Sequence, residues 1–168
     1  HPGAMLLELG AGRTRLLAGA LIDPEKLGPT LPPPADFHQF WTAKIADLHK
    51  IPMNPQLQPA DSGHPDIAYF KLQMDGYAGS HIYGQLAEPR APGKHPALLQ
   101  LQWAGVYGLP ASNVVTRAQQ GWLALNIEPH DLPFDQPPAF YQAASEGAQK
   151  DYYHQGNNDR DKTYFLRI

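Results

Sequence analysis

The chain has 168 residues, of which 42% are hydrophobic and 17% charged, with a net charge of −3 at pH 7. This length and composition are typical of one globular domain with a buried core. The slightly acidic balance provides no basic stripe for phosphates and excludes a nucleic-acid partner. No apolar run approaches the roughly 20 residues that cross a bilayer, so no membrane partner is expected. Cys is absent, which excludes disulfides and thiol chemistry but leaves the compartment open.

The first 35 residues carry little information about a fold. His1 to Met5 has the composition of a cloning remnant and is left out of the fold argument. Arg13 to Ile22 is apolar enough for one strand but has no partner strand nearby. We therefore expect residues 1–27 to be a tag remnant and the tail of an upstream segment. Residues 28–35 are rich in proline, which holds the chain extended, so we expect a linker there.

Asp36 to Lys50 is predicted as the first helix. Asp36 can cap the helix, and Gln39 follows three residues later, as in a capping box. Apolar side chains recur at helical spacing, so we expect them to form one packed face. These side chains are Phe37, Phe40, Trp41, Ile45 and Leu48.

Two alternating segments then predict an antiparallel hairpin. Ile67 to Met74 alternates apolar and polar residues, and so does Ser80 to Ala87. The glycines Gly76 and Gly79 lie between them, where a turn is needed.

The second half of the chain has a different pattern. Pro96 to Leu101 and Trp122 to Ile127 are dense apolar runs, which are typical of strands covered on both faces of a parallel sheet. Ser112 to Gly121 lies between them and predicts the connecting helix, with Gly121 at its end. Ala139 to Lys150 is predicted as a further helix. Asn158 or Asp159 is expected to cap a final helix that is still continuing at the last residue.

Three segments in this order resemble the acetyl xylan esterase and cephalosporin C deacetylase family of α/β-hydrolases. They cover the start of the first predicted helix, the exit of the hairpin into the first parallel strand, and the predicted final helix. The segments are Pro34 to Trp41, Gly84 to Pro89 followed by Lys94 to Ala97, and Asp159 to Arg167.

The resemblance implies an α/β fold for residues 36–168, with an antiparallel hairpin followed by a parallel strand–helix–strand unit. Members of this family remove acetyl groups from acetylated sugars or small esters by means of a serine that a histidine activates and a carboxylate orients. The serine lies on a tight turn, Gly-x-Ser-x-Gly, which is absent from this sequence. We therefore expect an amino-terminal portion of an α/β-hydrolase sheet, truncated before the nucleophile strand, with its catalytic triad beyond Ile168 and no activity alone. A secreted or periplasmic parent protein is compatible with this family.

One functional element is expected within the chain. In this fold, half of the oxyanion hole is a backbone N–H in the loop after the first parallel strand. The family has His-Gly-Tyr-Asn there, and the alignment places residues 102–105 at that point. The resemblance therefore implies the N–H of Ala104 as the oxyanion donor, with Gly105 in the same pocket. For Trp103, a wall of the acyl pocket and a core position are both open.

His130 and Asp131 follow the second parallel strand, where such sheets bind ligands. Neighbouring residues on one loop point apart, so we favour loop shaping and capping by Asp131 over direct catalysis, with pocket lining as a weaker role. The remaining histidines lie in separate elements without ligand spacing, so we expect no metal and no cofactor.

The expected partner of the parent protein is an acetylated carbohydrate or small ester. Without a nucleophile strand beside it, the strand at residues 96–101 would leave an apolar sheet edge open, which predicts self-association. Two other functions remain open: a non-catalytic carbohydrate-binding or interaction module on an esterase-like framework, and a short enzyme that uses His130 and Asp131 in different chemistry.

Overall fold

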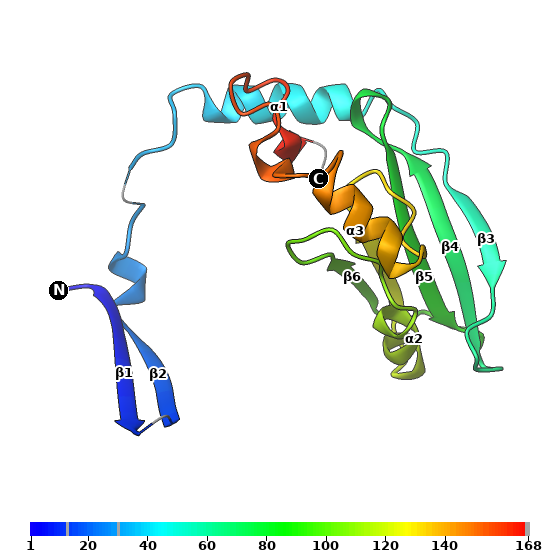
Figure 1. Cartoon of the computed structure of the whole chain (residues 1–168), viewed down its shortest axis with the longest axis horizontal. Helices are drawn as coiled ribbons and strands as arrows, with labels where there is room; N and C mark the ends of the chain where they lie inside the picture. The colour runs from blue at the N-terminus through cyan, green and yellow to red at the C-terminus, as the bar shows by residue number, and fades with distance from the viewer. Residues whose placement is uncertain (13, 30, 167–168) are drawn as a thin grey trace. The chain divides into compact units, whose positions relative to one another are not determined.

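The computed structural model describes residues 1–12, 14–29 and 31–166 (Figure 1). The chain separates into two units, His1–Ala43 and Lys44–Ile168, and each unit has its own β-sheet. No helix in the described residues is long and apolar enough to span a membrane.

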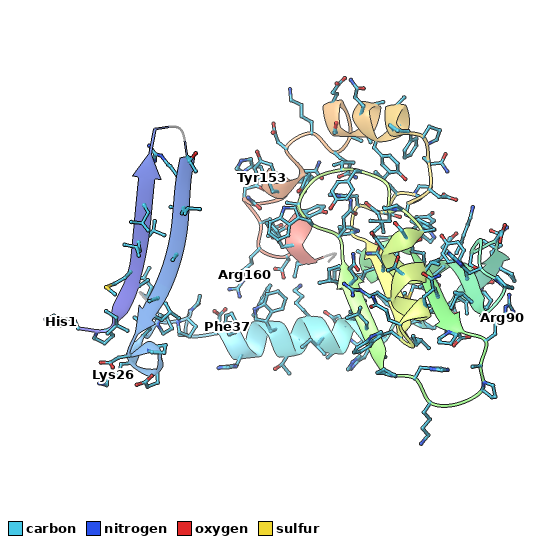
Figure 2. All side chains as sticks on the ribbon, turned by 90° about the horizontal axis from the view of Figure 1, so that it is seen from below. His1, Lys26, Phe37, Arg90, Tyr153 and Arg160 are labelled. Atoms are coloured by element: carbon cyan, nitrogen blue, oxygen red, sulfur yellow. The ribbon has the colours of Figure 1, made fainter. Side chains whose placement is uncertain are left out.

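The first unit contains a β-hairpin. Strand β1 (Gly3–Ala11) pairs antiparallel with β2 (Thr14–Ile22), and a short 3-10 helix, η1 (Pro24–Lys26), follows. The expectation of one strand without a partner is therefore wrong, and the residues set aside as a cloning remnant include the start of β1. Arg13, the expected first residue of that strand, lies outside the described residues. Side chains project from both faces of the hairpin (Figure 2).

Helix α1 (Phe37–Leu48) confirms the first predicted helix, slightly shorter than expected. None of its residues is buried, however, and Trp41 and Ile45 are 40% and 51% exposed. The expected packed face is therefore wrong for the described residues. The helical spacing places these apolar side chains on a common face, but spacing alone does not determine whether that face is buried.

The second unit is built on a five-stranded sheet in the order β3-β4-β5-β7-β6, of which Figure 1 labels β3, β4, β5 and β6. The predicted hairpin is confirmed as the antiparallel pair β4 and β5, and the predicted parallel pair is confirmed as β6 and β7. Strands β5 and β7 join the two parts antiparallel. Strand β3 was not predicted, because its glutamines and Pro59 do not form an apolar alternation. The bounds are β3 Gln56–Ala60, β4 Ile67–Asp75, β5 His81–Pro89, β6 Ala97–Leu101 and β7 Leu123–Glu128.

One face of this sheet holds the core. Helix α2 (Ser112–Gln119) connects β6 to β7 and packs against β4, β5 and β7. Its buried residues Val114, Val115 and Ala118 meet Ala87 and other small side chains of the sheet. The peptide N–H of Gly121 bonds to the Ala118 carbonyl oxygen, and Gly121 has a positive φ of 91°, as expected for a glycine that ends a helix.

The covered face also contains a ladder of hydrogen-bonded polar side chains across the strands. The Tyr69 hydroxyl donates to Gln85 Oε1 at 2.8 Å, and Gln85 Nε2 donates to Asn126 Oδ1 at 3.1 Å. Asn126 Nδ2 then donates to the backbone oxygen of Gln100 on β6 at 2.9 Å. Gln85 and Asn126 are both fully buried. The ladder thereby links β4, β5, β7 and β6 through side chains that have partners.

The end of the chain differs from the sequence-based expectation. Helix α3 (Pro138–Glu146) is present but ends four residues early, and a 3-10 turn, η3 (Tyr152–His154), follows. The final helix expected from residue 158 or 159 is not formed in the described residues, and Arg167 of that segment lies outside them. Instead, Asp159 Oδ1 accepts a hydrogen bond from the Asp161 N–H, and only a 3-10 turn, η4 (Tyr164–Leu166), forms. The local Asp turn competes with the first turn of a helix.

Candidate functional site

Two loops meet at the carboxyl ends of the parallel strands. Residues 102–111 follow β6 and lead into α2, and residues 129–137 follow β7 and lead into α3. Because β6 and β7 are parallel neighbours, both loops emerge at the same edge of the sheet. Direct contact joins them, since the His130 imidazole Nε2 lies 2.8 Å from the Gly105 carbonyl oxygen.

The loop after β6 carries the expected oxyanion donor. Ala104 lies three residues after the end of β6, and its N–H makes no hydrogen bond with any described residue. Gly105 has a φ of 118°, a region that favours glycine. Gln102 Nε2 donates to the carbonyl oxygens of Tyr107 at 2.9 Å and Gly105 at 3.3 Å. The loop is therefore held by specific bonds although it has no regular secondary structure.

His130 is 3% exposed and lies behind this loop. A carbonyl oxygen can only accept, so Nε2 carries the proton toward Gly105, and Nδ1 accepts the Tyr164 hydroxyl at 2.7 Å. Burial lowers the pKa of His130, while the hydrogen bond to Gly105 opposes this shift. His130 is thus a neutral imidazole at pH 7 with both nitrogens occupied, which leaves no free nitrogen for a general base.

Asp131 bonds to β5 and not to the His130 imidazole, whose nitrogens face Gly105 and Tyr164. Its φ is 58°, and its Oδ1 accepts the backbone N–H of His81 at 3.0 Å. This bond ties the loop after β7 to the first residue of β5. His130 and Asp131 therefore do not form a base and orienting carboxylate with each other.

Glu128, the last residue of β7, was not singled out in the sequence. Its side chain is 1% exposed, and its Oε2 accepts the backbone N–H groups of His130 at 2.8 Å and Leu132 at 3.2 Å. Burial raises the pKa of Glu128 to about 7, against the lowering effect of these two hydrogen bonds. Its position at the carboxyl end of an apolar strand was the signal available in the sequence.

The pocket residues expected from the sequence do not share one cavity. A cavity of about 320 Å³ is lined by Asp131, Glu128 and apolar strand residues such as Leu101 and Ile127, but not by Gly105 or His130. Trp103 also lies outside this cavity and is 83% exposed. Trp103 is therefore not part of the core that the described residues form, and its role as a wall of the acyl pocket stays a prediction.

The described residues contain no serine hydroxyl paired with a histidine, as catalysis by this chemistry would need. The chain has four serines, Ser62, Ser80, Ser112 and Ser145. The hydroxyls of three of them donate to backbone oxygens, and no described serine hydroxyl bonds to an imidazole. The part of the chain that the structure describes also contains no group of three His, Cys, Asp or Glu side chains that could hold a metal.

The acetyl xylan esterase (AXE1) family matches residues 23–168. A curated relative, acetyl esterase Axe7A of Xylanibacter ruminicola, is 26% identical over 149 residues, which are 86% of this chain and 34% of the relative. The chain thus spans about a third of that relative's length.

Two solved structures share the fold. Acetyl xylan esterase 1 from Thermoanaerobacterium sp. JW/SL YS485 has a TM-score of 0.59 at 16% identity, over 82% of this chain and 43% of that chain. The acetyl xylan esterase from Paenibacillus sp. R4 has a TM-score of 0.63 at 23% identity, over 83% of this chain and 45% of that chain. Together with the match over residues 23–168, these findings show that the chain belongs to the acetyl xylan esterase family of carboxylic ester hydrolases.

Proposed function

We propose that this chain supplies one half of the oxyanion hole of a serine esterase that removes acetyl groups from acetylated sugars or small acetyl esters. Family membership supports the reaction class, and the relative named acetyl esterase supports the acyl group. The observation that carries the proposal is the N–H of Ala104, which lies just after β6 and has no hydrogen-bond partner among the described residues. A backbone N–H without a partner is what a developing oxyanion requires.

In the proposed reaction, a serine oxygen attacks the acetyl carbonyl carbon while a histidine takes the serine proton. The carbonyl electrons move onto oxygen, and Ala104 donates its N–H to that oxyanion. When the tetrahedral intermediate collapses, the sugar hydroxyl leaves with the proton, and water then releases acetate from the serine. We assign the nucleophile, acid and base to polypeptide outside these 168 residues, because the sequence has no Gly-x-Ser-x-Gly turn.

The sheet edge supports the same assignment. Strand β6 is the last strand in the order β3-β4-β5-β7-β6, and its Leu99 and Leu101 are 57% and 65% exposed. An apolar edge of this kind pairs readily with a further strand. In the proposal, a strand that carries the serine pairs with β6 in the active protein. In the chain alone, we expect this edge to drive self-association.

Hydrolysis of p-nitrophenyl acetate tests the proposal. We expect no turnover above a heat-denatured control for residues 1–168, and turnover for the complete reading frame that encodes them. Turnover by residues 1–168 at the level of the longer protein would contradict the proposal. Inactivity of both proteins, together with calorimetric binding of xylan oligosaccharides, would instead support a carbohydrate-binding module.

A further inference from the structure

The peptide groups on both sides of Ala104 are held by side chains. The Trp103 carbonyl oxygen, which belongs to the peptide that contains the Ala104 N–H, accepts the Tyr107 hydroxyl at 3.2 Å. On the other side, the Gly105 N–H donates to Tyr152 Oη at 2.9 Å. The carbonyl oxygen of Gly105 accepts His130 Nε2 at 2.8 Å. Three consecutive peptide planes therefore have a fixed orientation. Among the described residues, the N–H groups of Ala104 and Val106 in these planes make no hydrogen bond, and that of Ala104 lies at the position where the resemblance implies the oxyanion donor.

The side chains that hold Gly105 are themselves fixed. The His130 and Tyr152 rings pack edge to face, with centroids 4.6 Å apart, and the Tyr152 and Tyr164 rings lie 4.9 Å apart. Tyr164 is 1% exposed and bonds to the second nitrogen of His130. Such contacts restrict the ring orientations, so the donor and acceptor that face Gly105 do not rotate freely.

Gly105 is suited to this arrangement by its backbone. With its φ of 118°, an L side chain would be strained, and an added Cβ would lie 3.3 Å from the Tyr107 ring. The loop has no strand or helix hydrogen bonds of its own, so its conformation depends on these contacts. The contacts come from the loop after β7 and from the segment that follows α3, well separated in sequence from residues 102–107.

We propose that His130 and Tyr152 are positioning residues that clamp Gly105 and thereby orient the Ala104 N–H toward the oxyanion. This inference rests on the proposed function of Ala104 as an oxyanion donor. It assigns no proton transfer to His130, whose nitrogens are both occupied in the clamp. Pre-orientation of a donor matters because a displacement of about 1 Å at a reacting centre can cost about 100-fold in rate.

The complete reading frame, assayed with p-nitrophenyl acetate, tests the clamp through three variants. We expect His130→Leu and Tyr152→Phe each to lower kcat at least about tenfold with KM within about twofold, since an oxyanion donor acts mainly in the transition state. His130→Gln keeps an N–H near the position of Nε2 and should recover most of the lost kcat. Tyr153→Phe is the matched control, because Tyr153 is 46% exposed and contacts neither Gly105 nor His130 through its hydroxyl.

A second readout uses the 168-residue chain itself. In its ¹H–¹⁵N NMR spectrum, His130→Leu and Tyr152→Phe should shift the amide signals of Ala104 and Gly105, whereas Tyr153→Phe should leave them in place. Active wild-type enzyme with unchanged kcat in His130→Leu and Tyr152→Phe would overturn the clamp and leave the proposed function standing. An inactive complete protein would overturn both. Equal loss of kcat in the Leu and Gln variants would show that His130 does not act through its N–H.

Discussion

The two faces of the five-stranded sheet have opposite characters. The face under α2 combines small apolar side chains with the fully buried Gln85 and Asn126. The other face carries leucines and isoleucines from the same strands, and toward the β6 edge these are largely exposed, with Leu99 at 57%. The polar side chains are therefore buried while many apolar side chains are not, which is the reverse of the usual distribution.

The covered face stabilises the fold of the second unit, and the open face is the surface that the unit presents to other polypeptides. On the covered face, buried polar groups are tolerated because every amide in the ladder has a partner. On the open face, apolar surface remains available for burial. The stability of this chain should therefore depend on the covered face, and its association should depend on the open face.

The largest effect is expected from the ladder. Asn126→Ala removes partners from Gln85, Asn113 and the Gln100 backbone oxygen. We expect the free energy of unfolding to fall by about 3 kcal/mol, because buried polar groups lose their partners. Urea unfolding followed by far-UV circular dichroism measures this loss. Gln73→Ala, at an exposed glutamine of β4, is the control and should change stability by less than about 0.5 kcal/mol. Equal losses in both variants would remove the distinction between buried and exposed amides.

The next effect compares an apolar side chain from each face. Val114 on α2 is fully buried, so Val114→Ala should lower the free energy of unfolding by about 2 kcal/mol through lost burial and a cavity. Leu99→Ala removes a larger side chain but one that is 57% exposed, and should cost less than about 0.5 kcal/mol. Thermal unfolding of the two variants at the same dilute concentration checks the order. A larger loss from Leu99→Ala would show that the open face is already covered in solution.

Glu128 makes the stability of the covered face depend on pH. Its pKa is raised from 4.5 to about 7 in the folded chain, so the folded state holds a proton that the unfolded state has released between these values. Its contribution to stability is fully present below pH 4.5 and is lost as the pH rises through 7. The slope is at most about 1.4 kcal/mol per pH unit.

Glu128→Gln should remove this slope, since the amide does not titrate. Urea unfolding of both proteins between pH 4.5 and 7.5 measures the difference between their free energies of unfolding. The lowered pKa of His130 makes stability rise with pH in both proteins, so its effect cancels in this difference. A constant difference across this range would show that Glu128 does not take up a proton on folding.

The smallest effect concerns association. Leu99→Lys with Leu101→Lys places charges on the exposed β6 edge, and we expect the dissociation constant of self-association to rise about tenfold or more. Leu57→Lys is the matched control, because Leu57 is 50% exposed on β3 at the opposite edge. Size-exclusion chromatography with light scattering over a concentration series measures both. A monomeric wild-type chain at all concentrations would contradict the association.

The central sheet was predictable because its strands follow simple patterns. Alternation in β4 and β5 and dense apolar runs in β6 and β7 are local signals, and the structure confirms both pairings. Strand β3 has no such signal, because its glutamines and Pro59 are residue types that predict a loop. The prediction of the final helix is wrong although its sequence carries a local signal. Asp159 has the residue type of a helix cap, but its side chain closes a turn instead of starting a helix.

The candidate site was predictable only in part. The resemblance implies the oxyanion donor at Ala104, and the position of His130 after β7 predicts that it lies near the ligand-binding edge of the sheet. The partners of the clamp could not be predicted, because Tyr152 and Tyr164 lie 47 residues after Gly105 and 34 residues after His130, respectively. Neither tyrosine follows a parallel strand, and Tyr164, although it lies in the segment Asp159 to Arg167, was predicted in a helix and not as a partner of His130. Only the folded chain brings these side chains together.

Strand β3 has one further consequence for the sheet. Pro59 has no N–H to offer, so a strand added beside β3 would lack a hydrogen bond at that position. We therefore expect the sheet to accept a further strand at the β6 edge more readily than at the β3 edge. Edge-to-edge pairing of two copies through β6 would occupy that edge in both copies. Self-association through β6 alone would then give closed pairs and not fibres.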